Sequence, residues 1–384
     1  MPRGDERLSV TEGLERRTDY GELCHQLRLL GLLDRRTGYY TLKIALTLLV
    51  VAGGWAGFAL LGNSWATLAV AAFLGLAFSQ VVFLGHDAGH QQICSSKQNN
   101  RRLGLVVGNL LTGLSFGWWV PKHNAHHAFP NQENRDPDIE AGVISFTAAH
   151  AAARRGIGRA FSKHQAVLFF PLLFLEGLNL HVSSVQTLRR QRADRSIKAE
   201  VILLSVHAVV YLGAVFAVLP VGKAVAFIAV QQGVFGFCLG CSFAPNHKGM
   251  PLITPDSQRS FAHRQVITAR NVKGGWLGSL LLGGLDYQIE HHLFPTMPRP
   301  NLGRAQPYVR AFCLEHGLPY QEDTVVSSYR QALRHLRSIG SGAGTDPVIR
   351  ARPERSSDRE PTPWTNPPPA ESRRDDVERP FVAD

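Results

Sequence analysis

The sequence predicts an all-α integral membrane protein with four transmembrane helices in two hairpins, plus interfacial helices and a cytoplasmic helical cap. Two observations predict this fold class. The stretches 44–85 and 201–246 are long and apolar, and the single charged residue in them is Lys223. The rest of the 384-residue chain is rich in charge, so the mean hydropathy is only −0.06. With such runs, a net charge of +11 favours a membrane surface over nucleic acid as the partner.

Each apolar stretch is long enough for two membrane crossings. As one helix the first stretch would extend over roughly 63 Å, about twice the thickness of a hydrocarbon core. Turn-forming residues around Asn63 interrupt the first stretch, and Pro220 interrupts the second. We therefore expect transmembrane helices at about 43–62, 65–85, 201–219 and 223–244.

The distribution of basic residues predicts the orientation in the membrane. Four crossings place the N-terminal segment, residues 86–200 and the C-terminal region on one side. Arginines and lysines gather on that side, whereas the opposite turns carry only Lys223. By the positive-inside rule the shared side, with both termini, is cytoplasmic.

Two shorter apolar stretches, Leu103–Val120 and Ala166–Val182, are expected to lie in the membrane interface. If the first of them crossed the bilayer, His123 would be on the opposite side from His86 and His90. These histidines could then not share one site, so we favour interfacial helices.

The flanking segments complete the domain organisation. Residues 1–41 are expected to be a cytoplasmic segment with an amphipathic helix, because leucines recur at helical spacing between 19 and 36. This helix either dips into lipid or packs on the cap. Residues 42–335 form the main domain. The composition of 340–384 is rich in Pro, Arg, Asp, Glu and Ser, which predicts a disordered tail.

The 16 histidines are concentrated at the ends of the apolar segments. His86 and His90 belong to HDAGH, residues 123–127 read HNAHH, and His291 and His292 end QIEHH. Residues at i, i+3 and i+4 of a helix project from one face, so each cluster can aim two or three imidazoles at one point. Neutral imidazole binds iron, copper, zinc and nickel. The three clusters therefore predict a metal site.

The number of histidines favours two metal ions. With His247, which stands alone after Pro245 and Asn246, eight imidazoles are available, whereas a structural zinc takes about four ligands. The alternative for His247 is a helix-end histidine that bonds a carbonyl group.

The motifs HDAGH, HNAHH and QIEHH, flanking two apolar hairpins, resemble the three histidine boxes of membrane fatty acid desaturases. The resemblance covers residues 40–320. Gln288, in place of a leading histidine, is similar to the front-end and linoleoyl-CoA desaturase-like branch. The stretches GWW, NRDPDI, FAPNHKGM and PRPNL resemble actinobacterial linoleoyl-CoA and stearoyl-CoA desaturase-like acyl-CoA desaturases.

This resemblance implies a di-iron centre in the cap, with O2 as co-substrate and no catalytic residue beyond the metal centre. The implied iron ligands are His86, His90, His123, His126, His127, His247, His291 and His292. The implied reaction puts a cis double bond into a long-chain acyl group, with acyl-CoA as substrate and Δ9 as the position. The implied location is the inner membrane of a bacterium.

The resemblance also implies an external source of electrons. Some relatives carry a fused cytochrome b5 domain, and residues 1–40 are too short for one. Electrons would therefore come from NADPH through a ferredoxin or an NADPH-dependent reductase. Such donors are often acidic, which suits a basic cytoplasmic face.

Polar residues beside the boxes are candidates for orienting the imidazoles or for binding metal weakly. They are Asp87, Asp136, Asp138, Asn246, Gln288 and Glu290. The alternative for the acidic residues is a surface salt bridge, and for Gln288 it is a role in shaping the pocket. Trp118, Trp119 and His181 are candidates for lining an acyl channel, although tryptophan also anchors proteins at the membrane interface.

Two other functions remain open. The first is a lipid hydroxylase or ketolase on the same scaffold, which differs only in whether oxygen is added or a second hydrogen is removed. The second is a non-enzymatic, histidine-rich zinc membrane protein or transporter. Transport favours polar ligands at the bilayer midplane, whereas these clusters lie at the ends of apolar segments.

Overall fold

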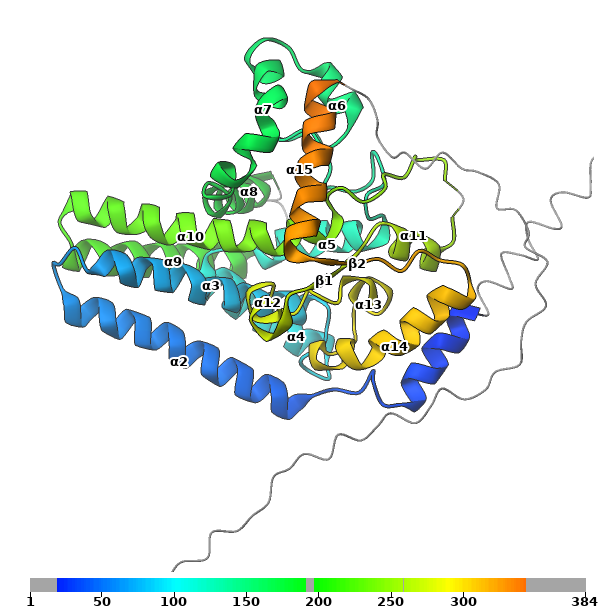
Figure 1. The fold of residues 1–384 in the computed structure, drawn as a ribbon. Helices are drawn as coiled ribbons and strands as arrows, with labels where there is room; N and C mark the ends of the chain where they lie inside the picture. The colour runs from blue at the N-terminus through cyan, green and yellow to red at the C-terminus, as the bar shows by residue number, and fades with distance from the viewer. Residues whose placement is uncertain (1–18, 191–196, 258, 343–384) are drawn as a thin grey trace, which may run out of the picture. The chain divides into compact units, whose positions relative to one another are not determined.

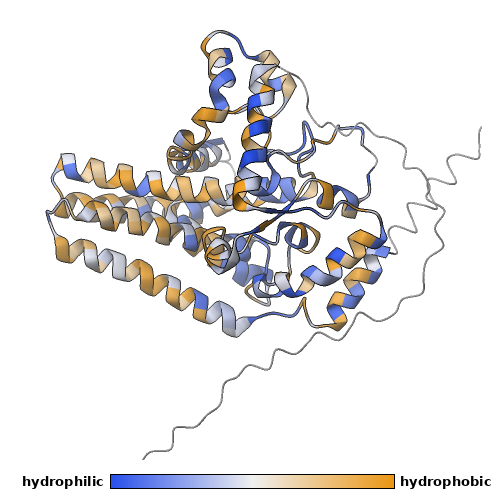
Figure 2. Ribbon diagram, viewed as in Figure 1, coloured by the Kyte–Doolittle hydropathy of each residue, from blue (hydrophilic) through white to orange (hydrophobic). Residues whose placement is uncertain are grey.

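The computed structural model describes residues 19–190, 197–257 and 259–342, and within them the fold is mostly helical (Figure 1). The described part contains four helices that are long and apolar enough to cross a membrane. They are α2 (Thr37–Leu61), α3 (Thr67–Gly89), α9 (Lys198–Val218) and α10 (Val221–His247). Figure 2 shows hydrophobic residues along all four. The four predicted apolar helices are therefore present, and two bent helix pairs raise the number of candidate spans to six if each pair is one span. The protein is a multi-pass membrane protein.

The two tight turns that join these helices lie at the same end of the bundle. Gly62, with a φ of 54°, ends α2, and Pro220 precedes the first residue of α10. The ammonium group of Lys223 donates to the carbonyl oxygen of Asn63 at 3.0 Å and to its side-chain oxygen at 2.8 Å. Since the turns meet there, α3 and α10 both run toward the opposite end, which is where their histidines lie.

Helices α3 and α10 form the centre of the bundle, while α2 and α9 lie outside them. In the most apolar 18-residue segment of each helix, 56% of the residues are buried in α3 and 39% in α10. The corresponding shares are 17% in α2 and 11% in α9. At Gly75 of α3 a Cβ atom would lie 2.8 Å from the carbonyl oxygen of Gln231, so glycine lets the two central helices approach closely. The exposed apolar faces of the outer helices suit contact with lipid.

The two stretches expected to lie in the membrane interface belong to two bent helix pairs. The first consists of α4 (Lys97–Gly104) and the π-helix η1 (Leu105–Thr112), followed after a bend of 115° by α5 (Phe116–Ala128). The second consists of α7 (Gly156–Leu173) and α8 (Glu176–Arg190), bent by 86°. The first bend contains Gly113, whose φ of 72° is a conformation that glycine adopts without strain.

The remaining elements form a helical cap beside the bundle (Figure 1). They are α6 (Ala148–Ala153), α11 (Phe261–Ile267), α12 (Gly275–Leu281), α13 (Gln288–Leu293), α14 (Arg299–Glu315) and α15 (Val325–Ser341). An all-α fold was expected, but two short strands, β1 (Asn271–Lys273) and β2 (Glu322–Thr324), pair in parallel. This pairing connects the segment before α12 to the segment before α15.

The N-terminal helix, residues 19–29, packs on the cap. Leu23 and Leu27 are buried in a cluster with Val309 of α14, and the Tyr20 hydroxyl donates to the carbonyl oxygen of Leu293 at 2.6 Å. Of the two expected alternatives, packing on the cap is the one found. The predicted disordered tail lies, from residue 343 onward, outside the described residues.

Candidate metal centre

Each histidine cluster is placed by the end of a helix. His86 lies in the last turn of α3 and His90 is its C-terminal cap, while α10 ends at His247. The second cluster lies on α5, which begins where the side chain of Ser115 accepts a hydrogen bond from the Trp118 amide. The third cluster lies on the short helix α13. Because the helical spacing that the motifs predicted is present, the imidazoles of each cluster can reach one point.

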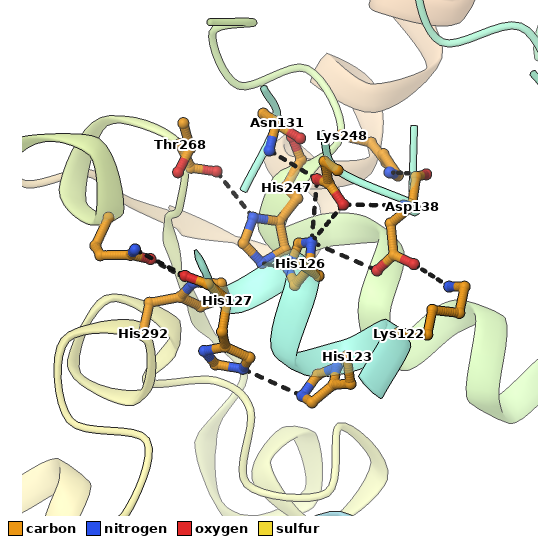
Figure 3. A network of polar contacts seen from close by, with 12 residues as sticks. Lys122, His123, His126, His127, Asn131, Asp138, His247, Lys248, Thr268 and His292 are labelled. Atoms are coloured by element: carbon orange, nitrogen blue, oxygen red, sulfur yellow. Dashed lines mark hydrogen bonds and ion pairs between the residues drawn. The ribbon is translucent and has the colours of Figure 1, made fainter. Parts of the chain in front are cut away.

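Seven histidines from four separate parts of the chain converge into two neighbouring groups, and an eighth, His127, lies beside both. Figure 3 shows His123, His126, His127, His247 and His292. In the first group the ligand atoms of His86, His90, His123 and His291 lie within 4.8 Å of one another. In the second, those of His126, His247 and His292 do so. His127 lies between the groups. Its Nε2 is 3.1 Å from Nε2 of His123, and its ring stacks on that of His292 at a centroid distance of 4.2 Å.

These residues fit metal ions. The Nε2 atoms of His86, His291 and His292 and the Nδ1 atom of His127 are buried and have no hydrogen-bond partner among the described residues. Leaving a buried polar atom unpaired costs free energy, which a metal–nitrogen bond would offset. Burial, with neighbouring imidazoles, holds the pKa values of His291 and His292 well below the usual range. Both rings are therefore neutral and offer a lone pair.

Two carboxylates orient imidazoles of the site. Nδ1 of His86 lies 3.2 Å from Asp87, and Nδ1 of His126 lies 3.0 Å from Asp136. Both carboxylates are buried, so neither forms the surface salt bridge that was the alternative. A carboxylate that accepts the Nδ1 proton fixes the tautomer and directs Nε2 toward the metal position.

Two neutral groups orient further imidazoles, and no motif in the sequence identified Thr268 or Gln265 as the partners. Nδ1 of His247 is 2.9 Å from the carbonyl oxygen of Thr268, and Nδ1 of His292 is 2.9 Å from the side-chain oxygen of Gln265. The Gln265 amide also donates to the carbonyl oxygen of His127 at 2.8 Å. The carbonyl contact predicted as the alternative for His247 thus exists alongside its place in the second histidine group.

A buried arginine fixes the position of Asp87, the carboxylate that contacts His86 of the first group. Arg299, at the start of α14, forms an ion pair with Asp87 and donates to the carbonyl oxygen of Phe83 at 3.0 Å. Arg299 belongs to the stretch PRPNL, but the sequence predicted no role for this arginine. Asp138 is only partly buried. It pairs with Lys122 and lies 3.5 Å from Nδ1 of His126.

Gln288 and Asn246 lie at the second group, whereas Glu290 does not. The Gln288 amide nitrogen is 2.9 Å from Nε2 of His247, and its oxygen accepts from the Asn246 amide at 3.0 Å. Glu290 was expected either to orient an imidazole or to form a surface salt bridge. Its buried carboxylate instead accepts from Tyr320 at 2.6 Å and from Asn271 at 2.8 Å, which anchors α13 to β1. Burial raises the pKa of Glu290 to about 7.

A cavity of about 610 Å³ opens beside the histidines. His86, His123, His126 and His247 form part of its wall, and most of the remaining wall is apolar. The lining also includes Val82, Leu114, Phe116, Phe169, Leu173, Leu239 and Phe243. The volume is within the range of roughly 300–1,000 Å³ typical of small-molecule sites.

The three residues expected to line a channel divide into two kinds. Trp118 and Trp119 both line the cavity, and the Trp119 ring stacks on His123 at a centroid distance of 4.4 Å. His181 is not among the lining residues. Its Nδ1 lies 2.9 Å from the carbonyl oxygen of Gly113, so the ring braces the bend before α5.

Comparisons with known proteins agree with this site. The sequence pattern of the family described as fatty acid desaturase matches residues 63–324. An acyl-lipid (9-3)-desaturase from the moss Physcomitrium patens is 32% identical over 315 residues, which are 79% of this chain and 59% of the moss protein. A Delta(8)-fatty-acid desaturase from Helianthus annuus is 27% identical, covering 83% of this chain and 72% of that protein. A Delta(5) fatty acid desaturase from Caenorhabditis elegans is 29% identical, covering 88% and 78%.

Two facts limit what these relatives say. This chain spans about three fifths of the length of the moss protein, 59%. The three relatives come from a moss, a flowering plant and a nematode, so they lend no support to a specific resemblance to actinobacterial acyl-CoA desaturases.

Proposed function

The chain belongs to the fatty acid desaturase family, and from this premise we propose that it is an oxidoreductase that introduces a cis double bond into a long-chain acyl group. The reaction consumes O2 and two external electrons. The observation that carries the proposal is the convergence of seven imidazoles into two groups, with His127 between them, beside an apolar cavity.

We propose that two iron ions occupy the two histidine groups. His86, His90, His123 and His291 would hold one ion, and His126, His247 and His292 the other. His127 lies between the groups and can serve either. When bound and reduced, the iron pair supplies the O2-dependent oxidising power that removal of hydrogen from an unactivated methylene pair requires. No side chain at the site is a base or nucleophile strong enough for that task.

The task of the protein is then to place the acyl chain and to keep water away. The apolar wall formed by Leu114, Phe116, Leu239 and Phe243 favours an acyl chain over water. Trp119, stacked on His123, closes the wall next to the first histidine group. An acyl chain that fills the cavity therefore lies beside both histidine groups. The fixed shape of the cavity wall holds the chain in one conformation, which sets the geometry of the double bond that forms.

We propose that the metal centre and both termini lie on the cytoplasmic side. Basic residues favour this orientation by the positive-inside rule, and electron donors would be present there. A ferredoxin or an NADPH-dependent reductase on that side would supply the two electrons that the proposed reaction consumes. The inner membrane of a bacterium stays a prediction from sequence.

The substrate and the position of the double bond need experiment. The resemblance seen in the sequence implied acyl-CoA and the Δ9 position. The name of the moss relative instead favours an acyl-lipid substrate, and the names of the three relatives favour the positions of (9-3), Delta(8) and Delta(5) desaturases. We therefore propose an enzyme that acts on the carboxyl side of an existing double bond, for which Gln288 in the third box is further support.

Expression in a host with defined fatty acids tests the proposed function. We expect a new acyl product that has lost two hydrogen atoms, and mass spectrometry of derivatives gives the position of its double bond. His126→Ala should abolish the product and leave membrane insertion intact. A product that has gained oxygen would favour the hydroxylase. Purified protein with one zinc ion, no iron and no O2 uptake would favour the zinc membrane protein. Product formation by His126→Ala would contradict the assignment of the site.

A further inference from the structure

A buried carboxylate that contacts no histidine lies at the bend between η1 and α5. Glu200, in the first turn of α9, is only 4% exposed. Its Oε2 atom accepts three hydrogen bonds, from the Asn109 amide at 3.1 Å, from the Ser115 hydroxyl at 2.7 Å and from the Gly117 N–H at 3.0 Å. An ionised group at this depth is tolerated only when donors satisfy it, and these three do so.

The three donors span the bend. Asn109 belongs to η1, Ser115 is the N-cap of α5, and Gly117 lies in its first turn. The side-chain oxygen of Asn109 also accepts from the Phe116 N–H at 3.0 Å. A carboxylate is favoured at a helix N-terminus, and Glu200 lies at two of them, the start of α5 and the start of its own helix α9. Glu200 therefore ties the end of η1 and the start of α5 to α9.

The contact explains the glycine in the Gly117-Trp118-Trp119 stretch. A Cβ atom at position 117 would lie 2.0 Å from Oε1 of Glu200. Any larger residue must displace either the carboxylate or the start of α5. The two positions are thus fitted to each other, although they are far apart in the sequence.

The start of α5 determines where several parts of the site lie. His123 and His126, further along the helix, belong to different histidine groups. Phe116 and Trp118, at its beginning, line the cavity. A shift of the first turn would therefore move the cavity wall relative to the metal ligands. Misplacement of reacting groups by about 1 Å can cost roughly a hundredfold in rate.

We propose that Glu200 is a positioning residue, whose carboxylate locks the bend before α5 so that the second histidine cluster and the cavity wall keep their places. It touches neither the metal nor the acyl chain. The expected effect on the product rests on the proposed function. The locking of the bend does not, because it can be measured without catalysis.

Hydrogen exchange of the full-length protein in lipid nanodiscs tests the lock directly. Glu200→Ala should speed exchange of the amides of residues 115–119 by about tenfold or more, both iron-loaded and metal-depleted, because three donors lose their acceptor. Glu200→Gln should lie in between, since its amide oxygen can still accept from the three donors but lacks the charge that strengthens these bonds. Glu315→Gln, the same change at an exposed position of α14, is the matched control and should exchange as the wild type does.

Product analysis tests the consequence for the site. Glu200→Ala should lower kcat by about tenfold or more and spread the double bond over neighbouring positions, while the control keeps one position. Gly117→Ala should do the same, and the double variant should be no worse than Glu200→Ala. If Glu200→Ala does not accumulate in the membrane, hydrogen exchange and product analysis are both carried out on Glu200→Gln and Gly117→Ala instead.

Two results would overturn the inference. One is wild-type exchange at residues 115–119 in the variants that accumulate, and the other is wild-type turnover with an unchanged double-bond position. A wild-type protein that modifies no acyl substrate would instead refute the proposed function, and the exchange result would still decide whether Glu200 locks the bend.

Discussion

Replacing Arg299 by methionine should destabilise the protein far more than the same change at an exposed arginine of the same helix. Arg299 is 8% exposed and its partner Asp87 only 1%. Removing one partner of a buried ion pair leaves a buried, uncompensated charge, which costs about 3–5 kcal/mol. Arg310, which pairs with Glu322 on the surface, is 56% exposed. Such an exposed pair contributes about 0–1 kcal/mol.

The expected difference is large enough to measure by thermal unfolding. At roughly 2 °C per kcal/mol for a large domain, Arg299→Met should lower Tm by about 6–10 °C and Arg310→Met by about 2 °C or less. The unpaired Asp87 carboxylate can also draw a second proton onto His86, and a protonated imidazole cannot bind a metal. Iron content should therefore fall in Arg299→Met and stay at the wild-type level in Arg310→Met.

A rescue variant separates the charge from the loss of packing. Asparagine at position 87 can still accept from Nδ1 of His86 but carries no charge. Asp87→Asn combined with Arg299→Met should regain most of the lost Tm, because no unpaired charge remains. The reasoning is refuted if Arg299→Met and Arg310→Met lower Tm equally, or if the double variant is less stable than Arg299→Met alone.

Three further predictions concern the metal centre. Asp136→Leu should weaken iron binding about 10–100-fold, because His126 loses the carboxylate that orients it, and unchanged iron affinity by titration would contradict this role. Gln288→Leu should lower iron affinity about tenfold without affecting membrane insertion, because the amide 2.9 Å from Nε2 of His247 is lost. A chelator should lower Tm of the wild type, since metal at 100 times its Kd adds about 2.7 kcal/mol of stability. The same chelator should lower Tm less in His291→Ala, which lacks a ligand of the first group but keeps the second, and equal shifts in both proteins would show that stability does not depend on the first group.

Part of the architecture was predictable because its signals are local. Membrane helices were found from runs without charge, and the turns from the residues around Asn63 and Pro220. Some helix ends differ from the predicted ones, since α2 begins at Thr37 rather than at about 43 and α10 continues to His247 rather than to about 244. Hydrogen bonds continue a helix beyond its apolar part, so hydropathy alone does not show where the last turn ends.

The histidine clusters were likewise visible in the sequence, because helical spacing places imidazoles on one face. Spacing could not show which clusters share a metal position. His123 and His126 lie on one helix yet belong to different groups, because His123 meets the histidines of α3 whereas His126 meets the histidine of α10, and α13 contributes one histidine to each group. The role of Glu290 was misjudged for the same reason, since only the position of β1 shows that its carboxylate meets Asn271.

The sequence by itself determined the four long apolar helices, the positions of the turns between them and the residue types that can bind metal, because these depend on neighbours within a few positions along the chain. Only the tertiary structure decided the grouping of the imidazoles, the partners that orient them and the lock formed by Glu200. Those features are contacts between distant segments, often with a backbone carbonyl or amide that every residue possesses. No residue type marks them in the sequence.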